Sequence, residues 1–361
     1  MSPDSTADSP RILVLLLGLI GDTLMRVPAV RALREEYPAA RIVALATPVV
    51  APALEINPLF DEVLVFDRRR LSLWQQARFY RSLRQRRFDM TIDFYYGART
   101  PFLAWCTGAR RRIGPARDGM ARRLLTDPTP FPLEPIHMVD RHLAILRPLG
   151  ISGGARRWEF PVSAAVQEEL TEVLTGAGVD PLPQAGDFVV TAGAGDVSKR
   201  WDDELLRQFM QRVVARELGV ARRVFIVTDQ RDPELVAQWS GIDGTVIVPC
   251  LTLPQLGALF TRVDLALVPD TGPMHIALAT APRLLTFFQS TDPEIHNAER
   301  PGYAYLYRHV CRYQPCDTRD KDKCELECRR SLSVEAMLEA ARVLLAGAAW
   351  DGEWEGSRGC R

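Results

Sequence analysis

The sequence predicts an α/β protein built from two successive doubly wound domains, each a parallel sheet with helices on both faces. Its 361 residues suit two domains of about 150 to 200 residues better than a single core. Strand-like apolar runs alternate with amphipathic, helix-like stretches, and this alternation restarts once after a stretch rich in Gly and Pro. Domains of this kind bind ligands at the carboxyl ends of their strands, so we expect two Rossmann-like domains that face each other across a cleft.

Four strand-like runs occupy the first half, at residues 11–17, 41–47, 62–67 and 88–94. Helical spacing of apolar residues separates them at 24–37 and 72–87. Alternating strands and helices predict a parallel sheet, because parallel strands need crossover connections.

The stretch "GAGVDPLPQAGD" at 176–187 has the composition of an interdomain linker. We therefore expect an N-terminal domain over residues 1–180 and a C-terminal domain over 181–330. The second domain contains five further strand-like runs, at 187–193, 222–228, 244–250, 263–269 and 283–289. A periodic helix at 331–347, capped by Ser333, opens a last region at 331–361 and is expected to pack across the interdomain region.

Composition and charge narrow the class of protein. The formal net charge is zero, which argues against general binding to nucleic acid. The apolar run at 12–20 is too short for a membrane helix, and the polar, acidic residues 1–10 do not resemble a signal peptide. Seven cysteines in a chain of this length do not suggest a secreted disulfide framework. We expect a cytoplasmic protein.

Basic residues are concentrated in the first half. Residues 1–150 contain 22 Arg, no Lys and 15 Asp or Glu, a balance of +7. Two interpretations are open. The arginines form a solvated surface, or they attract an anionic acceptor or the anionic inner face of the cytoplasmic membrane, where the protein would bind peripherally.

The segment "GLIGDT" at 18–23 follows the first strand and contains Asp22. It lacks the full G-x-G-x-x-G pattern of dinucleotide-binding domains, which disfavours a dehydrogenase. Asp22 either caps a helix that begins at Thr23 or serves as a base at the mouth of a cleft.

Two loops of the second half have features of phosphate-binding sites. In "TAGAGDVSKRWDDE" (191–204), small residues allow close approach of backbone N–H groups, and Lys199 and Arg200 can neutralise a phosphate. The chain has only three lysines, so Lys199 hints that a compact ammonium is needed there. An ordinary surface turn is the alternative.

The other loop, "PDTGPMHIALA" (269–279), predicts a helix with Pro273 at its first position, and Gly272 lets the chain turn tightly into it. Its first N–H groups and Thr271 form an anion site, and His275 lies in the first turn. The alternative for His275 is a structural role in the core.

Taken together, these motifs resemble glycosyltransferase family 9, the ADP-heptose:lipopolysaccharide heptosyltransferases and their relatives. The matching segments are "GLIGDTLMRVPAVRALREEYP" (18–38), "NPLFDEVLVFD" (57–67), "GARRRIG" (108–114), "VDRHLAILRPLGI" (139–151), "SKRW" (198–201), "DTGPMH" (270–275) and "STDP" (290–293). They occur in the family's order over nearly the whole chain. The resemblance implies a GT-B fold, with acceptor on the first domain and nucleotide-sugar donor on the second.

The resemblance also implies roles for individual residues. Asp22 matches the catalytic base, which takes a proton from an acceptor hydroxyl during an inverting displacement of the nucleoside diphosphate. Donor-binding matches are Thr191, Lys199, Asp270, Thr271, Gly272 and His275. Arg200 and Asp232 are further donor-binding candidates, and Gly21, Arg110, Arg111 and Arg112 are acceptor-binding candidates. The implied donor is ADP-heptose, the implied acceptor is an anionic glycan such as the lipopolysaccharide inner core, and catalysis requires no cofactor. No Asp-x-Asp motif stands at a strand end, so fixed cationic groups would stabilise the leaving diphosphate.

Some segments depart from the family pattern. "VTDQRDPE" (227–234) replaces a Gly-Gly turn followed by Glu, which leaves Asp232 or Glu234 to hold the ribose. "FQSTDP" and "ATAPRLL" differ from the usual Gly-Pro and Gly-Thr-Pro turns. Two alternatives therefore stay open, a relative with a different donor and acceptor, and a catalytically inactive GT-B-like binding scaffold.

Four cysteines cluster near the end, Cys311, Cys316, Cys324 and Cys328. Four thiols in so short a span can hold a structural zinc or iron, although the usual C-x2-C pairs are missing. Unmetallated or disulfide-paired thiols are the alternative.

Overall fold

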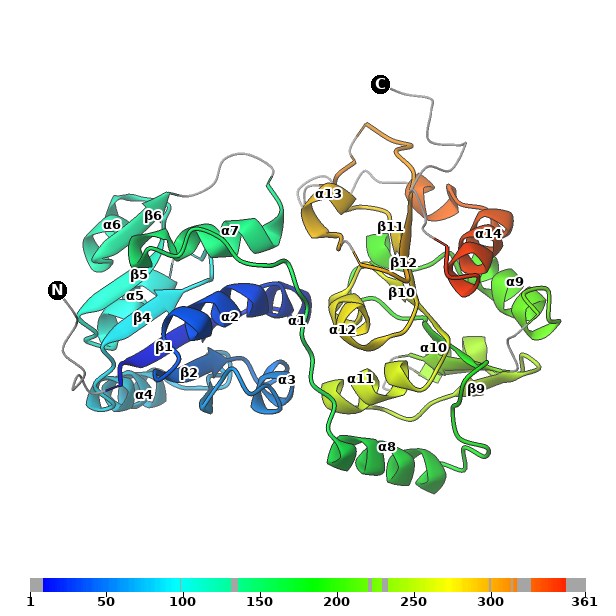
Figure 1. Cartoon of the computed structure of the whole chain (residues 1–361), viewed down its shortest axis with the longest axis horizontal. Helices are drawn as coiled ribbons and strands as arrows, with labels where there is room; N and C mark the ends of the chain where they lie inside the picture. The colour runs from blue at the N-terminus through cyan, green and yellow to red at the C-terminus, as the bar shows by residue number, and fades with distance from the viewer. Residues whose placement is uncertain are drawn as a thin grey trace. The chain divides into compact units, whose positions relative to one another are not determined.

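The computed structural model describes residues 9–97, 99–130, 136–219, 223–228, 233–298, 300–312, 314–316 and 326–348. The chain divides into two compact units, Met1–Glu159 and Phe160–Arg361. Each contains one six-stranded sheet, and the strand pairs are parallel (Figure 1). The predicted α/β class with two doubly wound sheets is confirmed.

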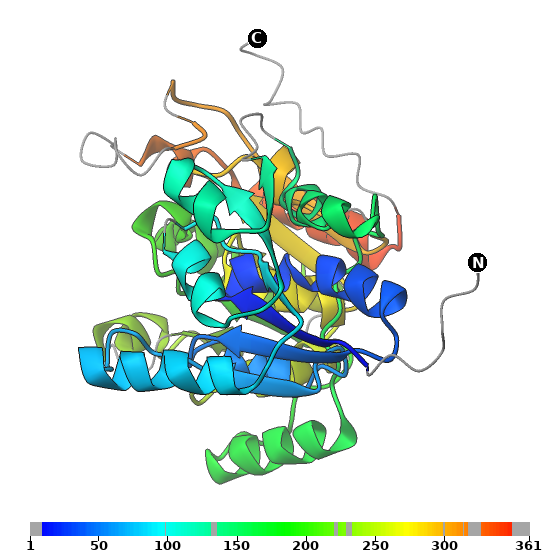
Figure 2. The ribbon, with the colours of Figure 1, turned by 90° about the vertical axis from the view of Figure 1, so that its left-hand side faces the viewer.

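The first unit has the strand order β3-β2-β1-β4-β5-β6. This is the Rossmann order, in which the chain runs outward from β1 to one side and then returns to build the other side. Helices α4, α5 and α6 form one layer on the sheet, and α2 and α7 pack together on the other side (Figure 2). The elements are β1 (Arg11–Leu16), α1 (Ile20–Leu24), α2 (Val27–Glu36), β2 (Arg41–Ala46), α3 (Ala51–Glu55), β3 (Glu62–Val65), α4 (Leu73–Gln85), β4 (Met90–Asp93), α5 (Thr100–Cys106), β5 (Arg111–Ala116), α6 (Gly119–Leu124), β6 (Asp127–Pro130), α7 (Met138–Ile145) and the 3₁₀ helix η1 (Arg147–Leu149).

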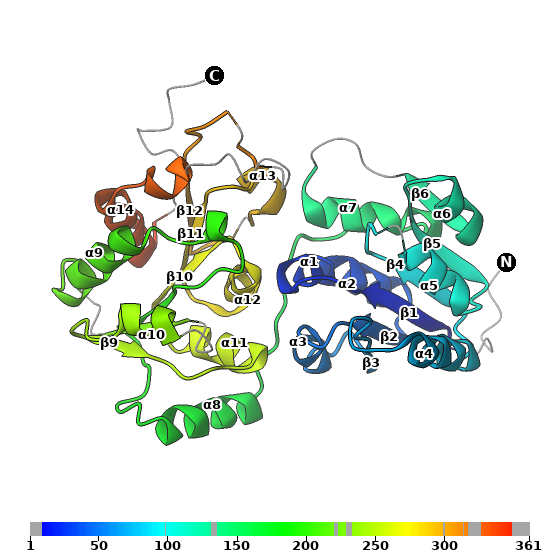
Figure 3. The same ribbon diagram turned by 180° about the vertical axis from the view of Figure 1, so that it is seen from behind.

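The second unit repeats this topology, with the order β12-β11-β10-β7-β8-β9. Helices α9 and α14 lie side by side, and α11 packs on α12 and α8 (Figure 3). The elements are α8 (Ala164–Gly176), β7 (Phe188–Thr191), η2 (Val197–Lys199), α9 (Asp203–Val214), β8 (Val224–Val227), α10 (Pro233–Trp239), β9 (Thr245–Ile247), α11 (Leu253–Thr261), β10 (Leu265–Pro269), α12 (Gly272–Thr280), β11 (Leu284–Phe288), α13 (Pro293–His296), β12 (Tyr303–Tyr307), η4 (Glu327–Arg330) and α14 (Val334–Leu345).

The structure places the division between the units earlier than the Gly/Pro-rich stretch at 176–187. Helix α8 belongs to the second unit, because Gln167 on α8 binds Thr261 and Arg262 at the end of α11. Helix α14, which we expected across the interdomain region, packs on α9 and against β11 and β12 inside the second unit.

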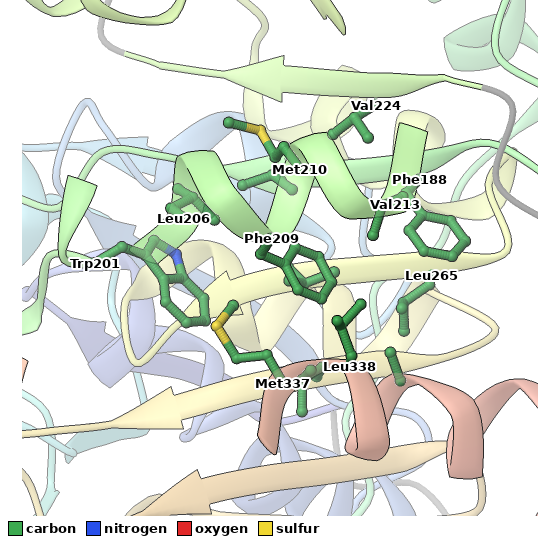
Figure 4. Close-up of a cluster of buried hydrophobic side chains, with 14 of the residues drawn as sticks. Phe188, Trp201, Leu206, Phe209, Met210, Val213, Val224, Leu265, Met337 and Leu338 are labelled. Carbon is green, nitrogen blue, oxygen red and sulfur yellow. The ribbon is translucent and has the colours of Figure 1, made fainter. Parts of the chain in front are cut away.

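Helix α14 completes the core of the second unit. Met337 and Leu338 of α14 lie beside Phe209 of α9 and the indole of Trp201, and Met210 on the other side of α9 belongs to the same buried cluster (Figure 4). All five side chains are fully buried. Burying side chains of this size contributes about 1.5 to 3 kcal/mol each, so α14 is an integral part of this unit.

The first helical segment differs from the single helix predicted at 24–37. The chain forms α1, turns at Met25 and Arg26, and begins α2 with Pro28 in its first turn. Proline lacks an N–H donor and fits only the first turn of a helix, which explains the new start. Asp22 consequently lies within the short α1, ahead of the break. Over the described residues, no helix has the length and apolar character needed to cross a membrane.

Candidate functional site

In the first unit, Asp22 lies just beyond the carboxyl end of β1. Strand β1 has β2 on one side and β4 on the other, so this edge is the switch point where doubly wound sheets bind ligands. The N-cap of α1 is Leu19, and its side chain makes no capping bond. Asp22 is half-buried, and no hydrogen bond or ion pair joins its carboxylate to another described residue. Asp22 therefore does not cap a helix in this structure.

A buried arginine, Arg26, faces this edge. Only 3% of its surface is exposed, and its Nε and Nη1 have no hydrogen-bond partner among the described residues. Burial lowers the pKa of Arg26, and the charges of Asp22 and Asp93 act in the opposite direction. The guanidinium also lies over the Tyr95 ring, 5.5 Å from its centroid. A Cβ on Gly18 would stand 2.9 Å from Nη1, so the glycine makes room for this group.

Asp93 ends β4, next to β1 in the sheet, and is fully buried. Burial raises its pKa to about 7, although the Tyr95 N–H donates to Oδ1 at 2.9 Å and Arg26 favours the ionised form. Oδ2 has no partner among the described residues. The sequence did not single out Arg26 or Asp93. Two charged residues inside each of the apolar stretches 24–33 and 88–94 were the available signal, and they do not distinguish Arg26 from Arg31 or Asp93 from Asp89.

The arginines of "GARRRIG" do not come together with Asp22. Arg111 and Arg112 open β5 and so lie at its amino end, whereas Asp22 follows the carboxyl end of β1. Arg111 pairs with Asp127 at 2.8 Å, and Arg112 donates to the backbone oxygens of Leu124 and Ala109. Arg110 is exposed. Gly21 lies beside Asp22 in α1.

In the second unit, Lys199 and Asp270 form an ion pair at the equivalent edge. Strands β7 and β10 are neighbours on either side of the switch point. Lys199 ends the loop after β7, Asp270 follows β10 directly, and Nζ lies 2.7 Å from Oδ2. The sequence placed these residues in two separate motifs. The parallel sheet brings the motifs together.

Asp270 is buried, with 4% of its surface exposed. Burial alone would raise its pKa, but Lys199 and the Thr291 hydroxyl, which donates to Oδ2, hold the pKa below its ordinary value. The Ser198 hydroxyl bonds to that of Ser290 at 3.0 Å. The "STDP" segment thus supports the Lys199 loop, a role that the sequence alone did not reveal.

Trp201 anchors the loop that contains Lys199 through a hydrogen bond of its side chain. Its buried Nε1 donates to the backbone oxygen of Thr191 at 3.1 Å. Thr191 is itself buried, and its hydroxyl has no partner among the described residues. The guanidinium of Arg200 points to Gln238 at 3.1 Å and Asp203 at 3.4 Å, away from the ion pair. Asp232 lies outside the described residues, and Glu234 is exposed.

Helix α12 starts one residue before the expected position, Pro273. Its N-cap is Thr271, whose hydroxyl donates to the oxygen of Pro269 and makes no capping bond. The helix begins at Gly272, directly after Asp270, with Pro273 in the first turn. His275 is buried, with 3% of its surface exposed. The N–H groups of a helix start and its dipole attract anions.

The described cysteines of the C-terminal cluster act electrostatically on one tyrosine. Burial raises the pKa of Tyr307 to about 12, and Asp292, Cys316, Cys311 and Cys328 add to the shift. Cys324 lies outside the described residues. Within the described part of the chain, no disulfide joins cysteines, and no group of three or more His, Cys, Asp or Glu residues could hold a metal ion.

Two doubly wound sheets in succession, each with charged side chains at its switch point, define a protein of the GT-B class. Residues 76–329 match the model of glycosyltransferase family 9 (heptosyltransferase), and the chain belongs to this family of glycosyltransferases. Over 287 residues it is 24% identical to lipopolysaccharide heptosyltransferase 3 of Escherichia coli, an alignment that covers 75% of this chain and 81% of that protein.

Solved structures show the same fold. A family 9 glycosyltransferase from Veillonella parvula superimposes with a TM-score of 0.81 at 20% identity, covering 94% of this chain and 98% of that one. ADP-heptose lipopolysaccharide heptosyltransferase II of E. coli gives 0.75 at 18% identity, covering 93% and 98%. The iron-containing glycosyltransferase TibC of enterotoxigenic E. coli gives 0.55 at 14% identity, covering 93% and 76%.

Proposed function

We propose that the protein transfers heptose from ADP-heptose to a hydroxyl of an anionic glycan such as the lipopolysaccharide inner core. The names of its relatives support this choice of donor and acceptor. The observation that carries the proposal is Asp22. Its carboxylate lies at the switch point of the first sheet without the capping bond that would explain it structurally.

In the proposed reaction, Asp22 is the general base. A carboxylate within reach of the acceptor hydroxyl accepts its proton while the hydroxyl oxygen attacks the anomeric carbon. The bond from that carbon to the diphosphate oxygen breaks, and ADP leaves with the electron pair. A single displacement of this kind inverts the anomeric configuration. Gly21, next to Asp22, leaves room for the acceptor.

The second unit holds the donor. Lys199 and the start of α12 supply positive charge beside Asp270, and we assign the diphosphate to them. Thr271 and Gly272 contribute the first part of α12, and Thr191 offers a buried hydroxyl without a partner among the described residues. His275 lies in the same helix. These fixed groups stabilise the charge that develops on the leaving diphosphate.

Three further assignments from the family pattern have less support. Asp232 is proposed to hold the ribose. Arg200 is a weaker candidate for the diphosphate, because its guanidinium contacts Gln238 and Asp203. Among Arg110, Arg111 and Arg112, Arg110 has the side chain best exposed for an acceptor. The reaction is proposed to take place in the cytoplasm, at the inner face of the cytoplasmic membrane.

Metal binding at the cysteine cluster is a separate proposal, supported by the three thiols near Tyr307. The described thiols alone do not form a metal site, so no catalytic step depends on one. Elemental analysis of the purified protein and of Cys316→Ser tests it. One zinc or iron per chain, lost in the variant, supports a structural metal, and a metal-free native protein contradicts it.

A donor screen tests the proposed transfer. The protein is incubated with ADP-heptose, UDP-sugars or GDP-sugars and a heptose-deficient lipopolysaccharide acceptor, and products are identified by mass spectrometry. We expect a mass increase of one heptose with ADP-heptose. Transfer from another nucleotide-sugar would establish the alternative donor. Calorimetry with ADP, UDP and GDP distinguishes an active transferase from an inactive scaffold, because the scaffold is expected to bind none of them tightly.

A further inference from the structure

The layer formed by α4, α5 and α6 has an unusual surface. Residues 68–126, which contain these helices, include fifteen arginines, three aspartates, and no lysine or glutamate. One of the aspartates, Asp93, is fully buried. The surface of this layer is therefore strongly cationic in a protein whose formal net charge is zero.

Most of these arginines are not paired with acids. Ten exposed arginines of residues 68–126 form no ion pair with a carboxylate of the described residues: Arg68, Arg69, Arg78, Arg81, Arg84, Arg87, Arg99, Arg110, Arg122 and Arg123. A solvated structural surface usually mixes both signs of charge. An unpaired cationic layer favours an anionic partner.

Large apolar side chains are exposed on the same layer. Leu73 and Trp74, in the first turn of α4, are 83% and 86% exposed, and Met120 on α6 is 72% exposed. On α5, the half-exposed rings of Phe102 and Trp105 stack at 5.8 Å. Among the described residues, Val197 is the sole exposed large apolar side chain of the second unit.

The three helices hold these groups side by side. Tyr80 of α4 meets Phe102 of α5 edge to face at 6.1 Å, and α5 also packs on α6 (Figure 2). Each helix starts after the carboxyl end of a strand, so Leu73, Trp74 and Met120 lie toward the sheet edge where Asp22 lies. Exposed apolar residues grouped on one surface mark an interaction site.

We propose that the α4–α5–α6 layer docks the protein on an anionic lipid bilayer. Tryptophan and leucine insert favourably at the level of the headgroups, and arginines near the surface are attracted to acidic lipids. A soluble polyanion would account for the arginines but would leave Leu73 and Trp74 in water. Docking would also present the edge with Asp22 to a lipid-linked acceptor, a consequence that rests on the proposed function.

Co-sedimentation of the full chain with vesicles tests the docking. We expect binding to phosphatidylcholine vesicles that contain about one third phosphatidylglycerol, and little binding to pure phosphatidylcholine. The triple variant Arg68→Gln, Arg69→Gln and Arg122→Gln is expected to partition about a hundredfold less strongly, since each arginine is worth about fivefold. The matched control is Arg147→Gln, Arg216→Gln and Arg330→Gln, three exposed arginines outside the layer.

A second variant tests the apolar contact. The double variant Leu73→Gln with Trp74→Gln replaces two highly exposed side chains. Its thermal unfolding midpoint should therefore stay near that of the native protein. We expect weaker vesicle binding and unchanged binding to inorganic polyphosphate. Quenching of tryptophan fluorescence by lipids with brominated acyl chains should fall in Trp74→Leu.

Three outcomes would overturn the proposal. One is an equal loss of binding in the control triple variant, which would indicate a general charge effect. Another is native binding to polyphosphate with none to anionic vesicles. The third is quenching by brominated lipids that does not change in Trp74→Leu.

Discussion

The two sheets carry equivalent edges with opposite electrostatic arrangements. In the second unit, Lys199 and Asp270 pair at 2.7 Å, so the buried carboxylate of Asp270 has a cationic partner. In the first unit, Arg26 has two nitrogens and Asp93 one oxygen without a hydrogen-bond partner among the described residues. The carboxylate of Asp22 is likewise not hydrogen-bonded there.

This difference has an energetic meaning. A buried polar atom without a partner costs about 1 to 3 kcal/mol, and folds tolerate that cost mainly at functional sites. At the second edge Lys199 is already paired with Asp270, and the start of α12 lies beside that pair. At the first edge the half-buried carboxylate of Asp22 has no hydrogen-bond partner among the described residues, as the proposed base requires.

The largest expected effect comes from breaking the paired edge. In Lys199→Met, Asp270 is buried beside no cation, and the free energy of unfolding at pH 7 is expected to fall by about 3 kcal/mol. The pKa of Asp270 is lowered in the native fold, so its contribution is present at neutral pH and lost in acid. In the variant, burial without the cation raises the pKa of Asp270, so the carboxyl takes up a proton as the pH falls and the loss should shrink toward pH 4, as measured by urea unfolding.

Lys199→Arg is the matched control, because it keeps the charge but replaces a compact ammonium by a planar group. We expect most of the stability to return and donor affinity to stay reduced. Equal stability of native protein and Lys199→Met at pH 7 would show that the pair does not support the fold.

The next effect is expected on the rate of transfer, from Arg26 at the edge of the first sheet. Removing Arg26 as Arg26→Met is expected to reduce the rate of transfer about tenfold, because the cation that faces Asp22 is lost. Arg26→Lys should recover part of the activity. Arg147→Met, an exposed arginine of the same unit, is the control and should retain native kcat/KM. Native activity in Arg26→Met would remove this arginine from the site.

Asp93 gives a smaller effect with a defined pH dependence. Its pKa is raised to about 7, so the native state keeps a proton that the unfolded chain loses from about pH 4 upward. This group therefore makes the protein less stable as pH rises toward 7. Asp93→Asn should gain about 2 kcal/mol relative to the native protein at pH 8 and little at pH 4.

Thermal unfolding at both pH values checks the Asp93 prediction. Glu55→Gln, on an exposed position of α3, serves as the control and should show no such difference between the two pH values. A lower midpoint of Asp93→Asn at pH 8 would mean that the fold stabilises the ionised carboxylate of Asp93 and that its pKa is not raised.

Much of the fold could be predicted from the sequence, because buried parallel strands are continuous apolar runs. Strands β1 and β2 are of this kind. Strand β5, "RRIGPA", begins with two arginines and contains Gly and Pro, and β6 is "DPTP". The apolar pattern of the sequence did not predict these two strands, because neither is a continuous apolar run. Strand β6 lies at the sheet edge, where proline is tolerated and apolar character is not needed.

The site could be predicted in part. Motifs placed Asp22, Lys199 and Asp270 at strand ends, where the structure has them. Arg26 and Asp93 were not found, because their importance lies in burial and in mutual charge, which sequence spacing does not reveal. The chain divides by contacts at Glu159 and Phe160, before α8, whereas the Gly/Pro-rich stretch that suggested a linker follows α8 within the second unit.

The transfer rate of Asp22→Asn, measured together with the affinity for ADP, tests the central claim most directly. The amide has the shape of the carboxylate but cannot accept the proton. We predict that transfer falls by about 10³-fold while ADP binds as it does to the native protein. Transfer near the native rate in Asp22→Asn would contradict the assignment of Asp22 as the base.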